Sequence, residues 1–350
     1  MEYQLKNYLL NLDNKKYVKK GSDNIRVYGL GKIIKNICSE IKRDYRNNKI
    51  TKNNLGYTNH PNWILNKSGI SINKLYSICK YWKKICNKSE RELEELWEEI
   101  YSKSEYFGCT NGKKMRLPKM MSYKLSYLLG IIMGDGHLAN PDISYDKLTT
   151  YNSELRLTDG NEETFIKLSF IFEDLFNYKP KIYSEFSKKN KRFYRFVIRS
   201  KPLHRFLMEV CQIPTGRKFD KVDIPKIIKS SSLDIQRAFI IGFFDADGCI
   251  RLAQNKHPDI SISQLNPKIL NSIIKVSKRF NIRWSGPYKM DCQRNHSSLI
   301  KISNRENVER FLNNFPSFNP IKIKQSEILW KVLKSQPILQ FKWMEIEDGG

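Results

Sequence analysis

The stretch IIGFFDADGCI, residues 240–250, decides the fold, because a near match, LLGIIMGDGHL, occupies residues 128–138. Each copy is an apolar run with glycine at its third position, a small residue four positions later, and then Asp-Gly. The acids that match are Asp135 and Asp247. A motif that occurs twice in one chain predicts two related halves, each organised around one copy.

Each motif has the signals of a buried helix. Ser122 can cap the first helix, and Ser231–Asp234 has capping-box spacing before the second. Gly136 and Gly248 are natural stops just past the last turn. Both segments are apolar on nearly all sides, which predicts that both helices lie inside the protein.

Small residues lie one turn apart on one face of each expected helix: Gly130 and Gly134 in the first, Gly242 and Ala246 in the second. Small residues at this spacing let two helix backbones approach closely. If the helices pack in parallel, the two motif aspartates emerge together. Their carboxylates would repel each other unless a cation lay between them, and oxygen-only ligands in a basic protein favour Mg²⁺.

Two simpler interpretations compete with a metal site. Asp-Gly can merely end a helix, but two matched copies that each follow a glycine-containing apolar helix are harder to explain in this way. The segment DADGC also resembles the start of an EF-hand loop, which Cys249 excludes because it stands where the third oxygen ligand belongs. Asp245 is matched by Met133, so it is not part of the repeated chemistry.

The charge balance points to a polyanionic partner. Lys and Arg number 62 against 36 Asp and Glu, a formal net charge of +26 in 350 residues. Such an excess favours nucleic acid. The 7 cysteines include no CxxC pair, so neither a disulfide framework nor a zinc site is indicated. With neither a signal-peptide pattern nor a membrane-spanning run, we expect an intracellular protein, cytoplasmic or nucleoid-associated, without a membrane partner.

The chain after each motif also repeats coarsely, as helix, two strands, helix, two strands, helix. This order predicts an α+β fold with antiparallel sheets. The clearest expected helices are 162–176 and 266–280, and the clearest strands are 154–158, 192–200, 259–263 and 298–304.

Alternation along the strands predicts one sheet face against helices and one basic face. In 192–200, Arg195 and Arg199 alternate with apolar residues, and in 298–304 Lys301 lies between two isoleucines. In a strongly basic chain such faces suit nucleic acid, although a solvated face is the simpler alternative for any one strand. The residues expected to contact DNA are Arg156, Arg195, Arg199, Arg251, Gln254, Lys289, Arg294 and Lys301.

The paired motifs resemble those of the LAGLIDADG homing endonucleases in their single-chain form. The likeness covers about residues 115–335 and includes LPKMMSYKLSYLLGIIMGDGHL, VDIPKII and RAFIIGFFDADGCI. It implies two pseudo-symmetric αββαββα halves, residues 115–228 and 229–340. Their motif helices would form the interface, and their saddle-shaped sheets would cover the major groove of a long, asymmetric DNA site.

The resemblance also implies a metal-dependent nuclease site. The last Asp of each motif, Asp135 and Asp247, would bind divalent metal and the scissile phosphates, sharing two or three Mg²⁺ or Mn²⁺ ions. The peptide oxygens of Gly134 and Ala246 would be further ligands. Two adjacent metal ions can activate water and stabilise the leaving oxygen in phosphodiester hydrolysis.

The family also uses one basic residue in each half to support developing charge. In the first half Lys221, in KFDKVDIP, fits this place, and Lys218 stays open. In the second half Lys322, in NPIKIKQ, fits, with Lys324 as the alternate. A lysine in a chain this rich in lysine is more often only a solvated charge.

The sequence therefore predicts a monomeric, site-specific double-strand DNA endonuclease of the intron-homing kind. One alternative is a maturase that binds intron RNA on the same scaffold, which basic faces suit equally. Another is a DNA-binding regulator that does not cleave. The intact acid pair weighs against a regulator, because a pure binder gains nothing from carboxylates near phosphates.

Residues 1–110 lie outside the resemblance and are expected to form a helical domain. Helices are indicated over 71–85 and 89–101, and a third begins near Gly29. Their order is loosely similar to repressor-type helix-turn-helix domains, with residues 58–69 near the recognition element. The alternative is a helical module that braces the rest of the protein.

Overall fold

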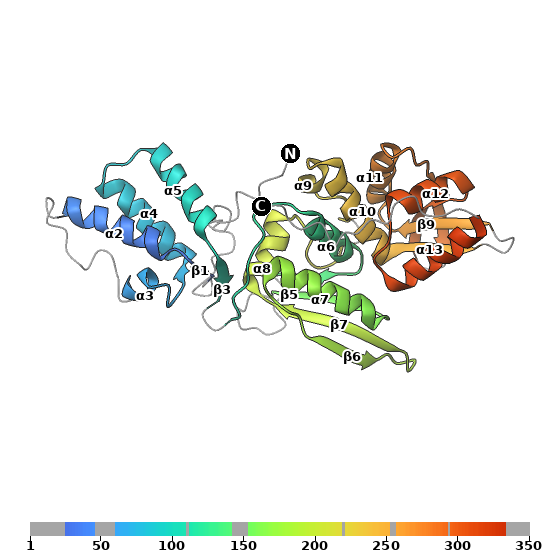
Figure 1. The fold of residues 1–350 in the computed structure, drawn as a ribbon, viewed down its shortest axis with the longest axis horizontal. Coiled ribbons are helices and arrows are strands. Elements are labelled where there is room, and N and C mark those ends of the chain that lie inside the picture. Colours follow the sequence, from blue (N-terminus) through green and yellow to red (C-terminus); the bar gives the residue numbers. More distant parts are fainter. Residues whose placement is uncertain are drawn as a thin grey trace.

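A computed structural model describes residues 25–45, 60–109, 112–141, 153–218, 221–252, 257–292 and 295–333. The chain forms an N-terminal domain followed by two similar halves, with helices α6 and α10 between the halves (Figure 1). Gln254 and Arg294, two of the expected DNA contacts, lie outside the described residues.

Each half runs helix, two strands, helix, two strands, helix, as the repeat predicts. The first half consists of α6 (Tyr123–Gly134), β4 (His137–Leu138), β5 (Glu154–Asp159), α7 (Glu162–Phe176), β6 (Ile182–Phe186), β7 (Arg192–Arg199) and α8 (Lys201–Arg205). The second consists of α10 (Leu233–Asp247), β8 (Gly248–Leu252), β9 (Pro258–Gln264), α11 (Pro267–Lys278), β10 (Ser285–Cys292), β11 (Asn295–Ile302) and α12 (Arg305–Asn314). Further helical segments are Phe206–Val210, which is a π-helix, α9 (Lys226–Lys229) and α13 (Pro320–Leu333).

Each half contains one four-stranded antiparallel sheet. The strand orders are β4-β5-β7-β6 in the first half and β8-β9-β11-β10 in the second. The strand that directly follows each motif helix, β4 or β8, is therefore an edge strand, and the remaining strands lie successively further from the motif. The predicted mixed fold with antiparallel sheets is confirmed.

One face of each sheet packs against helices. Phe196 and Ile198 of β7 are buried, and the Phe196 ring lies 4.5 Å from the Phe165 ring of α7. In the second sheet Ile300 and Ile302 of β11 are equally buried. The alternation expected along both strands is therefore confirmed. Burial of every second residue in turn fixes the register of each strand.

Capping residues set where the helices begin. Ser122 accepts a hydrogen bond from the Leu125 backbone N–H at 3.2 Å, as expected. The expected cap of α10 was wrong by one residue, because Ser232 accepts from the Ile235 N–H, at 3.4 Å. The hydroxyl of Ser231 instead donates to the Ile227 carbonyl at 2.7 Å and closes the preceding turn.

Helices α6 and α10 pack in parallel with their backbones in contact. The Ser126 hydroxyl near the start of α6 donates to the Ile235 carbonyl near the start of α10, at 2.7 Å. Further along, a Cβ atom added to Gly130 would lie 2.2 Å from the Phe239 carbonyl oxygen. One added to Gly242 would lie 2.0 Å from the Tyr127 carbonyl oxygen. Only glycine fits at such separations.

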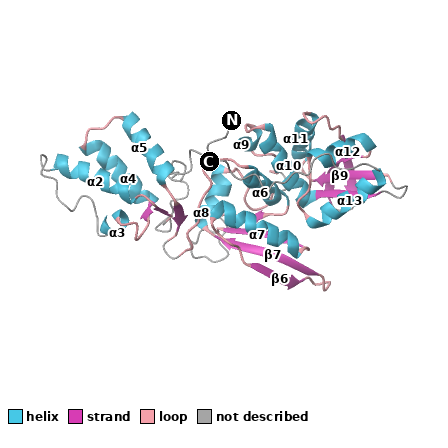
Figure 2. Cartoon of the chain, in the orientation of Figure 1, coloured by secondary structure: helices cyan, strands magenta, loops and turns pink. Residues whose placement is uncertain are grey.

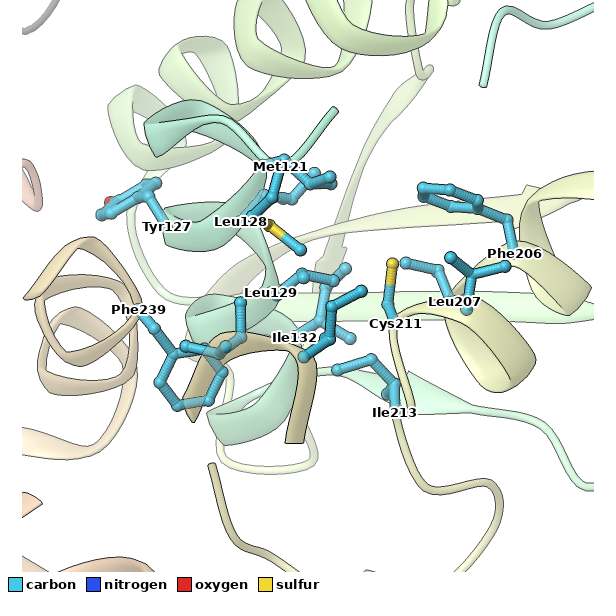
Figure 3. Close-up of a cluster of buried hydrophobic side chains, with 14 of the residues drawn as sticks. Met121, Tyr127, Leu128, Leu129, Ile132, Phe206, Leu207, Cys211, Ile213 and Phe239 are labelled. Atoms are coloured by element: carbon cyan, nitrogen blue, oxygen red, sulfur yellow. The ribbon is translucent and has the colours of Figure 1, made fainter. Parts of the chain in front are cut away.

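The two central helices are enclosed by protein. Figure 3 shows Leu129 and Ile132 of α6 between Phe239 of α10 on one side and Leu207 and Ile213 on the other. All five side chains are buried. Within the described ranges, no helix is long and apolar enough to cross a membrane.

The N-terminal domain is not wholly helical, in contrast to the expectation. Among the residues of this domain that the structure describes, short strands form an antiparallel sheet of order β2-β1-β3 beside helices α2 to α5 (Figure 2). Two or three residues are too few to show a strand period in the sequence. Its elements are β1 (Arg26–Tyr28), α2 (Gly31–Tyr45), α3 (His60–Ile64), β2 (Ile70–Ser71), α4 (Ile72–Ile85), α5 (Glu90–Lys103) and β3 (Tyr106–Gly108).

The segment after β3 ties this domain to the first half. Phe107 of β3 exchanges two backbone hydrogen bonds with Met115, at 2.7 and 2.8 Å, and both side chains are buried. The next residue, Arg116, donates its backbone N–H to the carbonyl of Phe176, at the end of α7, at 2.8 Å. Backbone pairing of this kind holds the domain against the first half.

Candidate active site

The two motif aspartates lie at the adjoining ends of the central helices. Asp135 is the residue that ends α6, and Asp247 is the last residue of α10. A Cβ atom added to Gly134 would lie 2.4 Å from Cβ of Ala246 and 2.9 Å from Oδ2 of Asp247. The residue directly before Asp135 therefore touches the Asp247 carboxylate, and two acids far apart in the sequence share one place.

The surroundings of Asp135 and Asp247 disfavour a negative charge on both carboxyl groups at the same time. Asp135 is open to solvent, yet the protein atoms around it raise the pKa of its carboxyl to about 6, helped by the negative charges of Asp247 and Asp159. Burial also raises the pKa of Asp247, against the opposing effect of the Lys218 ammonium. A cation bound between the carboxylates would relieve their repulsion.

A lysine caps the end of each motif helix, half-buried Lys218 in the first and buried Lys322 in the second. Nζ of Lys218 donates to the carbonyls of Ile132, Met133 and Gly134 in α6, at 3.1, 2.9 and 2.9 Å. These carbonyls carry the negative end of the helix dipole, which explains how an aspartate is tolerated there.

The second lysine cap repeats the arrangement of the first. Nζ of Lys322 donates to the carbonyls of Phe244 and Asp245 in α10, at 2.7 and 2.5 Å. The expected placement of Lys322 beside its motif agrees with this geometry. Lys324, its alternate, is exposed on α13.

In the first half the lysine at the site is Lys218 rather than Lys221. The side chain of Lys221 is exposed. The Lys221 N–H donates to the Lys218 carbonyl at 2.8 Å, but only Lys218 reaches the end of α6. Spacing to the following Ile-Pro cannot show which of the two lysines reaches the helix, so the sequence alone favoured the wrong one for this cap.

Both capping lysines lose part of their affinity for protons. Burial lowers the pKa of Lys218 to about 8, although Asp247 and Asp135 act in the opposite direction. Burial likewise lowers the pKa of Lys322, against the attraction of Asp245. Both ammonium groups can stabilise negative charge, and that of Lys218 can also exchange a proton near neutral pH.

Gln264 and Asp159 also belong to the site, and sequence reasoning missed both. Nε2 of Gln264 donates to Oδ2 of Asp247 at 2.6 Å. Asp159 acts on Asp135 through its charge. Each is the last residue of its strand and stands two residues before the asparagine that caps the next helix, Asn161 or Asn266. An alignment of the two halves on these asparagines places Asp159 and Gln264 at matching positions, and this match could have identified both residues from the sequence.

Asp245, which the repeat left unexplained, anchors the loop that leads to Lys322. Its carboxylate accepts from the Tyr127 hydroxyl at 2.9 Å and from the backbone N–H groups of Phe318 and Asn319 at 2.8 and 3.1 Å. The Ser317 hydroxyl donates to the same carboxylate. This acid is 2% exposed, so these hydrogen bonds replace its hydration.

The donor set suits a hard divalent cation but is incomplete by itself. Asp135 and Asp247 offer carboxylate oxygens, which Mg²⁺ prefers. The Gly134 carbonyl, an expected ligand, accepts from Lys218 and has one further lone pair. Among the described residues no group of three His, Cys, Asp or Glu side chains could hold a metal ion. Peptide oxygens such as that of Ala246, water or phosphate oxygens would have to complete the coordination.

Most of the described residues expected to contact DNA lie on the sheet faces turned away from the helices. In the first sheet Arg156, Arg195 and Arg199 alternate with the buried apolar residues. In the second, Arg251 and Lys301 do the same.

Lys289 lies on the opposite, helix-side face of the second sheet. It pairs in register with Ser298, whereas its neighbours Tyr288 and Met290 pair with Leu299 and Ser297. A register shift between Ser285 and Tyr288 inverts the alternation along β10, which the sequence pattern does not reveal.

Two solved structures similar to this chain are complexes of homing endonucleases with DNA. I-DmoI in complex with DNA and Mn is 22% identical, with a TM-score of 0.41, covering 56% of this chain and 97% of that one. The I-LtrWI LAGLIDADG homing endonuclease bound to target DNA is 13% identical, with a TM-score of 0.40, covering 61% of this chain and 90% of that one.

Curated relatives match this chain over a small part of their own length. A glutamine–fructose-6-phosphate aminotransferase of Methanocaldococcus jannaschii is 25% identical over 75% of this chain and 22% of its own length. A replication factor C small subunit of the same organism is 28% identical over 64% of this chain and 11% of its own. The tRNA-splicing ligase RtcB of Pyrococcus furiosus is 28% identical over 60% of this chain and 23% of its own. Since the three names describe unrelated activities, the shared segment is tied to none of them.

A family model matches the part of the chain that begins with the second motif helix. The matched range, residues 234–316, runs from the first turn of α10 through α12 and includes Asp247 and Gln264. Residues 234–316 are therefore similar to the LAGLIDADG-like domain, and this confirms the resemblance that the paired motifs indicate.

Proposed function

We propose that this protein is a site-specific, divalent-metal-dependent endonuclease that cleaves both strands of a long DNA site. The observation that carries the proposal is the meeting of Asp135 and Asp247 at the ends of two parallel helices, each capped by a lysine. A binding protein has no use for two converging carboxylates, because they repel the phosphates that it must contact.

The residues of the site divide the work of phosphodiester hydrolysis. The carboxylates of Asp135 and Asp247 would hold Mg²⁺ or Mn²⁺, which supplies Lewis acidity and a nucleophile from bound water. Lys218 and Lys322 lie beside the acids with their ammonium groups fixed by helix carbonyls. Cations fixed in this way stabilise negative charge that develops on a phosphate without first having to reorganise. Gln264 orients the Asp247 carboxylate.

The sheets supply the contact with DNA. Their faces carry Arg156, Arg195 and Arg199 in the first half, and Arg251 and Lys301 in the second. The net charge of +26 attracts a duplex to these faces. The edge strands β4 and β8 begin beside the acid pair. Bases read by the outer strands, which are β7 and β6 in the first sheet and β11 and β10 in the second, would therefore lie further from the point of cleavage.

The direct test is a cleavage-site screen. The full-length protein is incubated with a plasmid library of random inserts and Mg²⁺, and the resulting ends are sequenced. The proposal predicts double-strand ends clustered at one sequence, and Asp135→Asn or Asp247→Asn should abolish them while DNA binding remains.

Folded protein that binds duplex DNA yet gives no ends would contradict the nuclease and favour the regulator. Selective binding to structured intron RNA over duplex DNA would instead favour the maturase. Purified protein eluting from a sizing column as a single chain, with and without DNA, would support the proposed monomer.

A further inference from the structure

The outer faces of the two sheets differ in chemistry. On the first sheet each arginine is held by a carboxylate of the same face. Glu154 contacts Arg156 at 2.6 Å and Arg199 at 3.1 Å, and Glu185 forms an ion pair with Arg195. These side chains lie on β5, β7 and β6, which follow one another outward from the acid pair. Each arginine–glutamate ion pair therefore presents a guanidinium group and carboxylate oxygens side by side, held in place by their contact.

A paired arginine and glutamate suits a base pair better than a phosphate. Guanine offers two acceptors in the major groove, N7 and O6, which an arginine fork matches. The amino group of the paired cytosine is a donor, which a glutamate accepts. The same glutamate repels phosphates and cancels part of the arginine charge, so contact with the backbone gains little. The arginine–carboxylate pairs of the first sheet thus match the groups that a G·C pair offers.

Both sheets carry apolar groups on this face, since Tyr183 of β6 is 39% exposed and pairs in register with Arg195. The outer strands of the second sheet, β11 and β10, differ in that they contain no arginine and present mainly apolar groups. Tyr288 and Met290 of β10 are 48% and 37% exposed. Tyr288 pairs in register with Leu299 of β11, and Nζ of Lys301 lies 5.9 Å from the Tyr288 ring. In this sheet Arg251 and Asp259 form an arginine–carboxylate pair, at 2.7 Å, on β8 and β9, the strands nearest the acid pair.

Apolar side chains in the major groove recognise the methyl group of thymine. No other base carries a methyl group there, so contact with an apolar side chain favours A·T pairs. Tyr288 and Met290 are exposed and Leu299 beside them is half-buried, so together they form an apolar surface that a partner can cover. A thymine-rich segment of duplex would cover it.

We propose that the DNA target is unequal in composition, with G·C pairs read by the first sheet and A·T pairs read by the outer strands of the second. The inference rests on the proposed function, because it assumes that these faces contact duplex DNA. It adds the class of sequence that the site prefers and names Arg195, Tyr288 and Met290 as residues that determine it.

The test is selection of bound duplexes from a random pool without divalent metal, using the full-length protein and its variants. The wild-type protein should select a site whose two halves differ in G·C content. Arg195→Lys keeps the charge and loses the fork, so discrimination at one or two G·C positions in one half-site should fall roughly tenfold. Met290→Ala with Tyr288→Ala should reduce discrimination only in the other half-site.

Matched controls lie on the same strands with their side chains on the opposite face. Arg192→Lys on β7 changes a residue whose Nε donates to the Ser184 hydroxyl at 2.8 Å, and Lys289→Ala is the control on β10. Neither should alter base preference. Two half-sites of equal composition, or uniform loss of affinity for all sequences in Arg195→Lys, would overturn the inference.

The inference and the proposed function fail in different ways. A selected, unequal site that the protein does not cut with Mg²⁺ would contradict only the nuclease. A site that is cut but has no compositional difference between its halves would contradict only the inference.

Discussion

Replacing Gly242 by alanine tests whether the two central helices must touch. A Cβ atom on Gly242 would lie 2.0 Å from the Tyr127 carbonyl oxygen, 2.9 Å from its carbon and 3.1 Å from the Ile131 nitrogen. Since carbon and oxygen atoms normally stay about 3.3 Å apart or more, the helices would have to separate by roughly 1 Å. All three atoms are backbone atoms, so no side chain can move aside.

Two effects of opposite sign set the magnitude. Overpacking at a buried contact costs about 1–3 kcal/mol, and more where only backbone can move. Alanine favours a helix interior over glycine by about 1 kcal/mol. We expect a net loss of about 1–2 kcal/mol in the free energy of unfolding, a fall of a few degrees in the melting temperature. Because Asp135 and Asp247 end these helices, divalent-metal binding should weaken as well.

The assay is thermal unfolding followed by circular dichroism, with and without Mg²⁺. Gly160→Ala is the matched control, because nothing lies within 4 Å of the Cβ atom that it adds. That variant should unfold at the wild-type temperature. If Gly242→Ala were more stable than the wild type, as helix propensity alone predicts, the close packing of α6 and α10 would be refuted.

Three further substitutions probe the groups around the acid pair. Lys322→Met leaves the Phe244 and Asp245 carbonyls without their donor and should cost about 1.5–3 kcal/mol in chemical denaturation, whereas exposed Lys324→Met should stay within about 0.5 kcal/mol of the wild type. Asp245→Asn should cost about 2 kcal/mol, because its carboxylate accepts hydrogen bonds from several donors at once; an unchanged denaturation midpoint would contradict the anchoring role. The pKa of Asp135 is raised to about 6, so its protonation stabilises the fold below about pH 4, and this contribution is lost as pH rises through 6. Asp135→Asn should therefore raise the melting temperature of chelator-treated protein above pH 6 but not below pH 4, and a difference independent of pH would exclude the repulsion.

The sequence predicted those features that repeat or alternate. Matched Asp-Gly ends after glycine-containing apolar runs located α6 and α10, and a period of two placed Arg195 opposite Phe196 on β7. The bounds of α7 agree with the prediction because Asn161 caps its start and Asn177, with a positive φ of 49°, ends it. Such signals depend only on residues that are close in the sequence, so they can be read without knowledge of the fold.

The features that were missed depend on geometry between distant segments. Lys218 reaches α6 from a part of the chain outside the regular helices and strands, and no spacing rule selects it over Lys221. Gln264 meets Asp247 only through the pairing of β8 with β9. The register shift that reverses Lys289 lies next to Gly286, whose positive φ of 106° is a property of the folded backbone.

Asp135 and Asp247 are proposed to form one shared metal site. Isothermal titration of Mn²⁺ into the protein bound to its selected duplex measures this directly, with Asp135→Asn and Asp247→Asn titrated beside the wild type. We predict that either substitution alone removes most of the metal affinity, because each carboxylate completes the coordination begun by the other. Two independent sites, each lost with only one of the substitutions, would contradict the account.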